Sequence, residues 1–436
     1  GVPGHMERGM MKRQYRDVVV WDAERTAAER CDVITEGDRI TSILPAGTLD
    51  SGCAYEGRGK MALIPGFVNA HGHAAMTLLR GLGEELPLME WLQERIWPVE
   101  NGLDGDLVKA GTKLAILEML STGTTCFADM YFFMDRVAEA ALECGMRCGL
   151  SRGIVGDSDG SKLKENLKLA DDFNGRDGLI NVQLGPHAPY TVPMELMKEI
   201  ANTAKDTGLG VQLHWLETSS EWSISGLEGK MTPEDYLAET GMIDVPNLLL
   251  AHCVWIRPQE SAFYARDNVT FAHNPKSNLK LGSGIAPLPA YLKAGVRVAL
   301  GTDGAASNNR LDIWDELRFA ALTQKGVNKD PTLVASAEAL RMATVNGAIG
   351  LGFRDVGLIK EGYRADMILI DLDRPHYVGW DSENLPGFLV YAGSSSDVRG
   401  TVVAGKMLYK DGDFVFTDRE RIITEATEAR RKLTGR

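Results

Sequence analysis

The chain has 436 residues, of which 44% are apolar, and a formal net charge of −13. This length and apolar content are typical of a large globular domain with a smaller one, or of two to three domains. The negative charge argues against a nucleic-acid partner and an anionic membrane, which both require excess Lys and Arg, and no apolar stretch approaches the roughly 18 residues of a membrane span.

The N-terminal residues contain neither an apolar h-region nor a small-residue cleavage site, so we expect a cytoplasmic protein without a signal peptide. Gly1 to His5 precede Met6 and resemble the remnant of an expression tag. No CxxC pair occurs, which predicts reduced thiols rather than a disulfide framework. The cysteines are Cys31, Cys53, Cys126, Cys144, Cys148 and Cys253.

Strand patterns occur at both ends of the chain. Near the N-terminus, residues 31–35 and 39–44 predict a hairpin around Gly37-Asp38, a dipeptide that tolerates positive φ. After about residue 355, strand patterns return at residues 365–372, 400–404 and 407–409. We therefore predict a small β-sandwich domain built from both chain ends, residues 6–65 and 356–436, with a helix at the C-terminus.

Between these ends, eight strand-like runs indicate a barrel. Most are separated by helical periodicities, the clearest of which places Leu107, Ala110, Leu114 and Leu117 on one face and stops at Gly123. Eight strands with intervening helices predict an α/β protein with a (β/α)8 TIM-type barrel over residues 66–355. The predicted strands lie near residues 67–71, 124–130, 147–152, 180–186, 210–214, 247–252, 269–273 and 296–302.

Histidine and aspartate residues end several of the predicted barrel strands. His71 and His73 are two residues apart, so on a strand both imidazoles point to the same face. His214 adds a third nitrogen and Asp303 an anionic oxygen at the face where barrel enzymes carry their chemistry. Three nitrogens, a carboxylate and an open position predict a catalytic site for a divalent metal. The fourth strand ends in His187 without a nearby Lys to bridge a second ion, which favours a single metal.

Glu217 and His252 each have two interpretations. Glu217 follows His214 by three residues, so the chain must turn between them if both face one ion; a buried carboxylate there can shuttle protons. Taken alone, Glu217 is better interpreted as a solvent-exposed loop residue, because the nearby Glu221 could equally provide the proton-shuttling carboxylate. His252 ends an apolar strand, where it is either a core residue or, beside a metal, a group that orients the attacking water.

The segments around these residues resemble the amidohydrolase superfamily. Within it, they are similar to the 5-methylthioadenosine/S-adenosylhomocysteine deaminases and the related ATZ/TRZ-type chlorohydrolases. The resemblance spans the whole chain, and its main segments are residues 65–73 (PGFVNAHGH), 185–190 (GPHAPY), 214–218 (HWLET), 250–253 (LAHC), 273–278 (HNPKSN) and 301–304 (GTDG).

The resemblance implies one divalent ion per subunit, Zn²⁺ or else Fe²⁺ or Mn²⁺, held by His71, His73, His214 and Asp303. It also implies substrate contacts at Glu100, Arg152, His187 and Glu217. A carboxylate at Glu100 suits ribose hydroxyls, although the residue alone fits a surface helix end. Arg152 needs a partner, either a protein carboxylate or the polar tail of a substrate. Trp215 and Gly72 depart from the family pattern; a departure at either position can reshape the pocket, so it leaves open the identity of the substrate but not the metal site.

We therefore expect metal-dependent hydrolytic deamination of an adenine nucleoside, such as 5′-methylthioadenosine, S-adenosylhomocysteine or adenosine, to ammonia and an inosine-type product. Asp303 would accept a proton from the attacking water, Glu217 would protonate the purine ring and His252 would orient the water. The alternatives are the deamination or dechlorination of guanine or a triazine at the same site, and an inactive scaffold, which the complete ligand set disfavours. We also expect a homo-oligomer without nucleic-acid or membrane partners.

Overall fold

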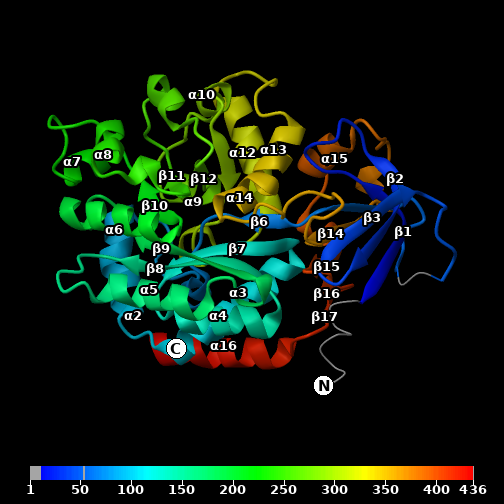
Figure 1. Cartoon of the computed structure of the whole chain (residues 1–436), viewed down its shortest axis with the longest axis horizontal. Helices are drawn as coiled ribbons and strands as arrows, with labels where there is room; N and C mark the ends of the chain where they lie inside the picture. Colours follow the sequence, from blue (N-terminus) through cyan, green and yellow to red (C-terminus); the bar gives the residue numbers. More distant parts are fainter. Residues whose placement is uncertain (1–10, 53–54, 436) are drawn as a thin grey trace.

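The computed structural model describes residues 11–52 and 55–435. The expectations for Gly1 to His5 and for Cys53 therefore lie outside the described residues. The strands of the described part form two sheets, an eight-stranded barrel and a mixed sheet beside it (Figure 1). Among its helices, none has the length and apolar character needed to cross a bilayer.

The barrel consists of eight parallel strands that follow one another in chain order around the sheet, as predicted. It is completed by backbone bonds between the segments after the first and last strands: Ala70 N donates to Leu300 O (2.8 Å) and Asp303 N to His71 O (3.0 Å). The strands are β6 (Phe67–Asn69), β7 (Thr124–Tyr131), β8 (Arg147–Ile154), β9 (Ile180–Pro186), β10 (Val211–Trp215), β11 (Leu248–His252), β12 (Val269–His273) and β13 (Arg297–Leu300).

The first barrel strand is shorter than predicted. β6 ends at Asn69, so His71 and His73 lie in the segment after the strand, and the prediction that both lie on one strand is wrong. The physical reason is irregular pairing: Ala70 and His71 bond to the end of β13, whereas Gly72 O accepts from Met130 N of β7 (3.3 Å).

Most of the helices before residue 345 cover the outside of the barrel and connect its strands, whereas α15 lies beside the mixed sheet (Figure 1). The longer ones are α3 (Gly105–Ser121), α4 (Met134–Cys144), α5 (Ser161–Phe173), α6 (Met194–Thr207), α12 (Ile313–Val327), α13 (Ser336–Ala343) and α16 (Arg419–Thr434). The shorter ones are η2 (Ala74–Leu79), α1 (Leu88–Glu90), η3 (Trp91–Ile96), α2 (Trp97–Glu100), η4 (Arg176–Gly178), α7 (Glu221–Ile224), α8 (Pro233–Glu239), η5 (Met242–Asp244), η6 (Pro258–Tyr264), α9 (Pro275–Lys280), α10 (Leu288–Lys293), α11 (Ala305–Asn308), α14 (Val345–Gly350), η7 (Pro375–Tyr377), α15 (Leu385–Tyr391) and η8 (Ser395–Asp397).

The predicted helix that stops before Gly123 is α3, but its buried side is wider than the predicted stripe. Ala110 and Leu114 of that stripe are only partly buried, and the most buried positions include Val108, Ala115 and Ile116. The C-terminal helix α16 packs against a second side of α3. Apolar residues therefore extend around most of α3, and periodicity alone does not identify the side that faces the barrel.

Small side chains and α14 close the lower part of the barrel. Ala128, Ala251 and Ala299 of the strands share one core with Ala348 of α14. Asn247, at the start of β11, donates to the carbonyls of Ile349 and Gly350 at 3.0 Å each, which ties α14 to the N-terminal ends of the strands. The C-terminal ends of the strands are thus the end of the barrel that is free to carry a site.

The second sheet combines both chain ends, as predicted. Alternate residues of its central strand β5 face different cores: Leu63 lies in the core of the sheet itself, and Ala62 and Ile64 lie in the core shared with the barrel. Val33 of β2 and Val402 of β15 also belong to the sheet's own core, so the two halves fold over one another as in a sandwich. In sheet order, the strands are β17 (Asp413–Phe414), β16 (Lys406–Lys410), β15 (Val398–Val403), β14 (Met367–Asp371), β5 (Met61–Pro65), β1 (Lys12–Val20), β2 (Glu29–Glu36) and β3 (Arg39–Pro45), with β4 (Tyr55–Glu56) beside β1.

Candidate active site

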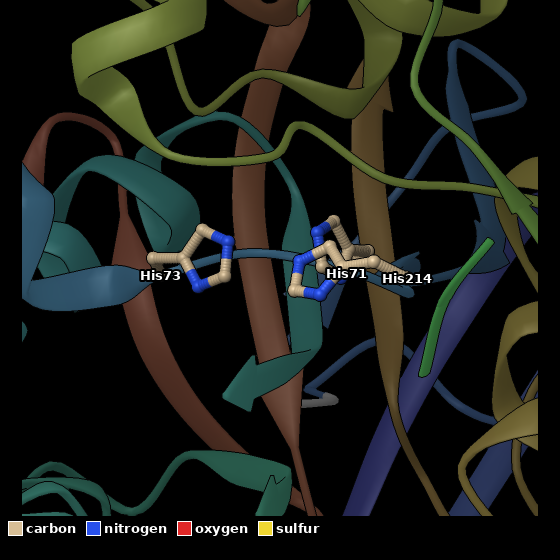
Figure 2. A group of neighbouring side chains, drawn as sticks. All are labelled: His71, His73 and His214. Carbon is tan, nitrogen blue, oxygen red and sulfur yellow. The ribbon is translucent and has the colours of Figure 1, made fainter. Parts of the chain in front are cut away.

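The polar strand ends converge at the C-terminal face of the barrel. The imidazoles of His71, His73 and His214 meet there (Figure 2), with ligand atoms within 4.8 Å of one another. Asp303 Oδ1 lies 3.4 Å from His71 Nε2 and 3.2 Å from His73 Nε2. The structure thus brings together all four residues that the sequence analysis assigned to one ion.

Left-handed backbone conformations turn several strand ends toward this point. Leu216 has φ +49°, His252 has φ +82° and Asp303 has φ +60°. Such values are uncommon for residues other than glycine and persist only where the surroundings hold them. Their clustering at three strand ends indicates that the fold is strained here in order to direct side chains toward one site.

Two of the histidines are oriented by the ring nitrogen that faces away from the site. His73 Nδ1 donates to the carbonyl of Met130 (2.6 Å), and His214 Nδ1 donates to that of His187 (2.8 Å). These bonds place a proton on Nδ1 and leave Nε2 as the atom that can bind an ion, which is the arrangement of a metal-ligating imidazole.

His71 and Asp303 also fit a cation. His71 is completely buried, and neither of its ring nitrogens has a hydrogen-bond partner among the described residues. Burial lowers its pKa to about 4, so the imidazole is neutral at pH 7. Burial alone would raise the pKa of Asp303, but the neighbouring imidazoles hold that pKa well below its usual range. A buried nitrogen without a partner beside an ionised carboxylate suits a divalent cation of the zinc type.

His252 and Glu217 lie next to this group, which resolves both open interpretations of their positions. Asn274 and Asn278 donate to His252 Nδ1 (3.2 and 3.0 Å), so Nε2 carries the proton and faces Glu217 Oε1 at 3.5 Å. Glu217 is 9% exposed, and burial raises its pKa. Glu217 is therefore not a solvated loop residue, and His252, although buried, faces the site.

Sequence reasoning missed the residues that support these groups. Asp303 Oδ2 accepts from the Ser277 hydroxyl (2.8 Å), and Asn274 and Asn278 hold His252. All three lie in the HNPKSN segment, whose histidine alone resembles a ligand. That histidine, His273, is buried outside the pocket lining. The segment itself was recognised in the sequence, but the presence of an amide or hydroxyl side chain does not predict which group it will bind.

A pocket of about 230 Å³ opens above the site. Glu100, His187 and Glu217, three of the four predicted substrate contacts, line it. Glu100 accepts from the Tyr131 hydroxyl (2.9 Å), and burial raises its pKa. His187 Nδ1 lies 2.9 Å from Thr191 Oγ1, and burial lowers the pKa of the imidazole to about 4, so the ring is neutral.

The fourth predicted contact, Arg152, is not brought into the pocket. Its Nε donates to Glu165 Oε2 (3.1 Å), and its guanidinium lies 5.6 Å from the ring centroid of Phe132, which does line the pocket. Of the two alternatives for Arg152, the structure therefore shows a protein carboxylate. Trp215 and Gly72 do not line the pocket themselves; Trp215 is buried in the core and donates to Tyr264 Oη (3.1 Å).

The outer part of the pocket is apolar and was not predicted. Four of its residues come from a helical segment over residues 88–100, in which η3 has the π-helical hydrogen-bond pattern that is frequent at functional sites. This short segment has no regular helical periodicity, so the sequence did not predict a helix here or its place in the pocket. Its apolar lining residues are Leu88, Trp91, Leu92 and Trp97.

The fold and site define a barrel hydrolase with a three-histidine, one-carboxylate cluster. Residues 62–408 match the model of the amidohydrolase family, and the chain belongs to this family. It is 43% identical over 412 residues to the 5-methylthioadenosine/S-adenosylhomocysteine deaminase of Pelotomaculum thermopropionicum, covering 93% of this chain and 94% of the relative. It is 42% identical over 414 residues to the 5′-deoxyadenosine deaminase of Methanothermobacter thermautotrophicus, covering 93% and 95%.

A solved structure agrees with these relatives. An adenosine deaminase from Xanthomonas campestris with bound zinc superposes with a TM-score of 0.91 at 34% identity, covering 97% of this chain and 98% of that one. The predicted family and barrel fold are confirmed, and the protein is a hydrolase that acts on C–N bonds.

Proposed function

We propose that this protein catalyses the hydrolytic deamination of an adenine nucleoside of the 5′-methylthioadenosine, S-adenosylhomocysteine or adenosine type, which yields ammonia and an inosine-type product. The observation that carries the proposal is the convergence of Glu217, His252 and Asp303 beside three histidines at the floor of one pocket. The names of the relatives support an adenine nucleoside as the substrate.

One divalent ion per subunit, zinc in our proposal, would be held by His71, His73, His214 and Asp303. The donor set supports this assignment, because imidazole nitrogens and one carboxylate suit zinc, with Fe²⁺ or Mn²⁺ as alternatives. When bound, the ion would acidify the attacking water and stabilise the negative charge that develops in the transition state.

The side chains around the ion divide the proton transfers between them. Asp303, an ionised carboxylate, accepts a proton from the attacking water. Glu217, whose raised pKa favours a protonated form, delivers a proton to the ring nitrogen beside the amino-bearing carbon. The Nε2 proton of His252 is available to orient the water, because Asn274 and Asn278 occupy Nδ1.

The substrate is oriented by residues farther from the ion. Glu100 accepts from the ribose hydroxyls, and the neutral His187 contacts the purine ring. Arg152 reaches the polar tail of a longer substrate only by leaving Glu165, because its guanidinium is engaged outside the pocket.

We also propose domain limits at residues 65/66 and 355/356, a homo-oligomeric assembly and a cytoplasmic location. The change from sheet to barrel between β5 and β6 supports the first limit. The cysteines that the structure describes are buried free thiols, which supports a reducing compartment. Light scattering on the purified protein tests the assembly.

Ammonia release on a substrate panel tests the function. We expect turnover of 5′-methylthioadenosine, S-adenosylhomocysteine or adenosine, none of guanine or a chlorotriazine, and one metal per chain by elemental analysis. Asp303→Asn should lose both metal and activity. Full metal content with no ammonia from any adenine nucleoside would refute the proposal, and turnover of guanine or the triazine alone would replace it with the alternative.

A further inference from the structure

Glu221 is a buried carboxylate that the chemistry proposed above does not use. It is the first residue of α7, and 2% of the residue is exposed. Among the described residues, its carboxyl oxygens bind backbone N–H groups and no cation, and it does not line the pocket. Burial raises the pKa of this carboxyl group to about 8, and burying it without a cationic partner is unfavourable, so another interaction must compensate for the lost hydration.

Both oxygens of Glu221 bind the backbone at the end of β10. Oε2 accepts from Leu216 N (2.6 Å), and Oε1 accepts from Glu217 N (3.1 Å). The backbone N–H of Glu221 in turn donates to Thr218 O (3.2 Å). Residues 216–221 are thus closed into a compact turn by one side chain and one backbone bond.

This turn determines where Glu217 points. His214 and Glu217 are three residues apart, so an unbroken strand would direct them to opposite faces. The left-handed Leu216, with φ +49°, breaks the alternation, and its carbonyl accepts from Val254 N (3.1 Å) and Trp255 N (3.0 Å) beyond β11. The strained residue is therefore held by bonds on both its N–H and its carbonyl.

We infer that Glu221 is a positioning residue for the deamination, because its carboxylate clamps the amides of Leu216 and Glu217 and so directs the Glu217 side chain at the reacting atoms. The inference depends on the proposed function. The two backbone hydrogen bonds explain why Glu221 is buried at a position where its carboxyl group contacts neither the pocket nor a cation. The carboxylate of Glu221 acts through Glu217 and touches no substrate.

Glu221→Gln tests the clamp, because the amide keeps one acceptor but turns an N–H₂ group toward the second backbone N–H. We expect kcat for the best adenine nucleoside of the panel to fall about 10- to 100-fold, as a displaced catalytic group does. KM and the metal content per chain should remain those of the wild type. If this variant does not fold, Glu221→Asp, which keeps the carboxyl group but has a side chain shorter by one methylene, addresses the same question.

Glu234→Gln is the matched control. Glu234 lies on the neighbouring helix α8, is 7% exposed and accepts from the Tyr264 hydroxyl (2.6 Å), outside the pocket. The same chemical change in the same part of the core should lower the melting temperature without changing kcat. A fall in kcat in the control as large as that in Glu221→Gln would overturn the inference.

A double-mutant cycle separates positioning from a general structural role. If Glu221 acts through Glu217, adding Glu221→Gln to Glu217→Gln should change kcat little, because the group that it positions is already disabled. Multiplicative losses, or a folded Glu221→Gln protein with the kcat of the wild type, would overturn the inference. An inactive wild type would instead remove the proposed function, so the two failures are distinguishable.

Discussion

Three imidazoles of the site, those of His73, His214 and His252, are each oriented by a hydrogen bond on the side that faces away from the pocket. The carbonyls of Met130 and His187 orient His73 and His214, and two asparagine amides orient His252. These bonds also divide the histidines by role, because the first two rings donate from Nδ1, which leaves Nε2 to bind an ion, whereas the third accepts at Nδ1 and carries its proton on Nε2. A change in any of these supports should alter function without removing a predicted ligand.

Arg152 gives a prediction at the residue scale, because it is paired with Glu165 at a site where Glu165 is half exposed. Glu165→Ala frees the guanidinium, and we expect kcat/KM for S-adenosylhomocysteine to rise up to about 5-fold, the range of an exposed ion pair. The value for 5′-methylthioadenosine, which lacks a charged tail, should not change. Steady-state ammonia release on both substrates measures the effect.

The control for this prediction lies on the same helix. Asp172→Ala removes an exposed ion pair with Lys168 and should leave both substrates unaffected. An equal gain on both substrates in Glu165→Ala would mean that Arg152 does not discriminate between their tails.

At the scale of elements, the strand ends form the site because they approach one another closely at the top of the barrel. Gly301 follows β13, and its N–H donates to His273 O (2.9 Å). A Cβ at Gly301 would lie 2.4 Å from Asn274 Oδ1 and 2.8 Å from His71 N. Glycine is therefore required between the end of one strand and the groups carried by two others.

Gly301→Ala should for this reason damage the site and the fold together. The added methyl group must displace either the support of His252 or the backbone of His71. We expect a loss of about 1–3 kcal/mol in the free energy of unfolding, as in other overpacked cores, together with reduced metal content and kcat. Urea unfolding and elemental analysis measure these effects.

Gly326→Ala is the comparison for that variant. Gly326 lies in helix α12 without a positive φ, and a Cβ added there would have no neighbouring atom within 4 Å. The same substitution there should stabilise the protein by up to about 1 kcal/mol through helix propensity and leave kcat unchanged. A stable, fully metallated Gly301→Ala protein would show that the strand ends have more room than their distances indicate.

At the scale of the whole molecule, a buried ion pair joins the barrel to the mixed sheet. Arg147 begins barrel strand β8, and Asp366 immediately precedes β14 of the sheet. Both side chains are almost fully buried, with Nε to Oδ2 at 2.5 Å and Nη2 to Oδ1 at 3.1 Å. Asp366 Oδ1 also accepts from Ala404 N (2.8 Å), so the pair connects three segments of the chain.

Arg147→Met should destabilise the molecule by about 3–5 kcal/mol, because it leaves a buried carboxylate without its partner. The double variant Arg147→Met/Asp366→Leu should recover most of that loss. Lys60→Met, which breaks an exposed pair with Asp373, should change the free energy of unfolding by less than about 1 kcal/mol. Urea denaturation of the three variants measures the differences, and a loss that the double variant does not recover would contradict the explanation.

The sequence by itself determined the barrel, the sheet built from both chain ends and the residues at the strand ends. It could do so because buried parallel strands are short apolar runs and because the C-terminal ends of parallel strands meet at one face. His71, His73, His214 and Asp303 were therefore recognisable as a group before their distances were known.

Only the tertiary structure decided what the other side chains touch. In the structure, Arg152 pairs with Glu165, and the Glu221 side chain accepts from the backbone N–H groups of Leu216 and Glu217. These outcomes depend on side-chain directions and on contacts between segments distant in the chain or on either side of a turn. Local periodicity predicts which residues are buried. It does not predict which buried polar groups form hydrogen bonds with one another, and these hydrogen bonds orient the side chains of the site.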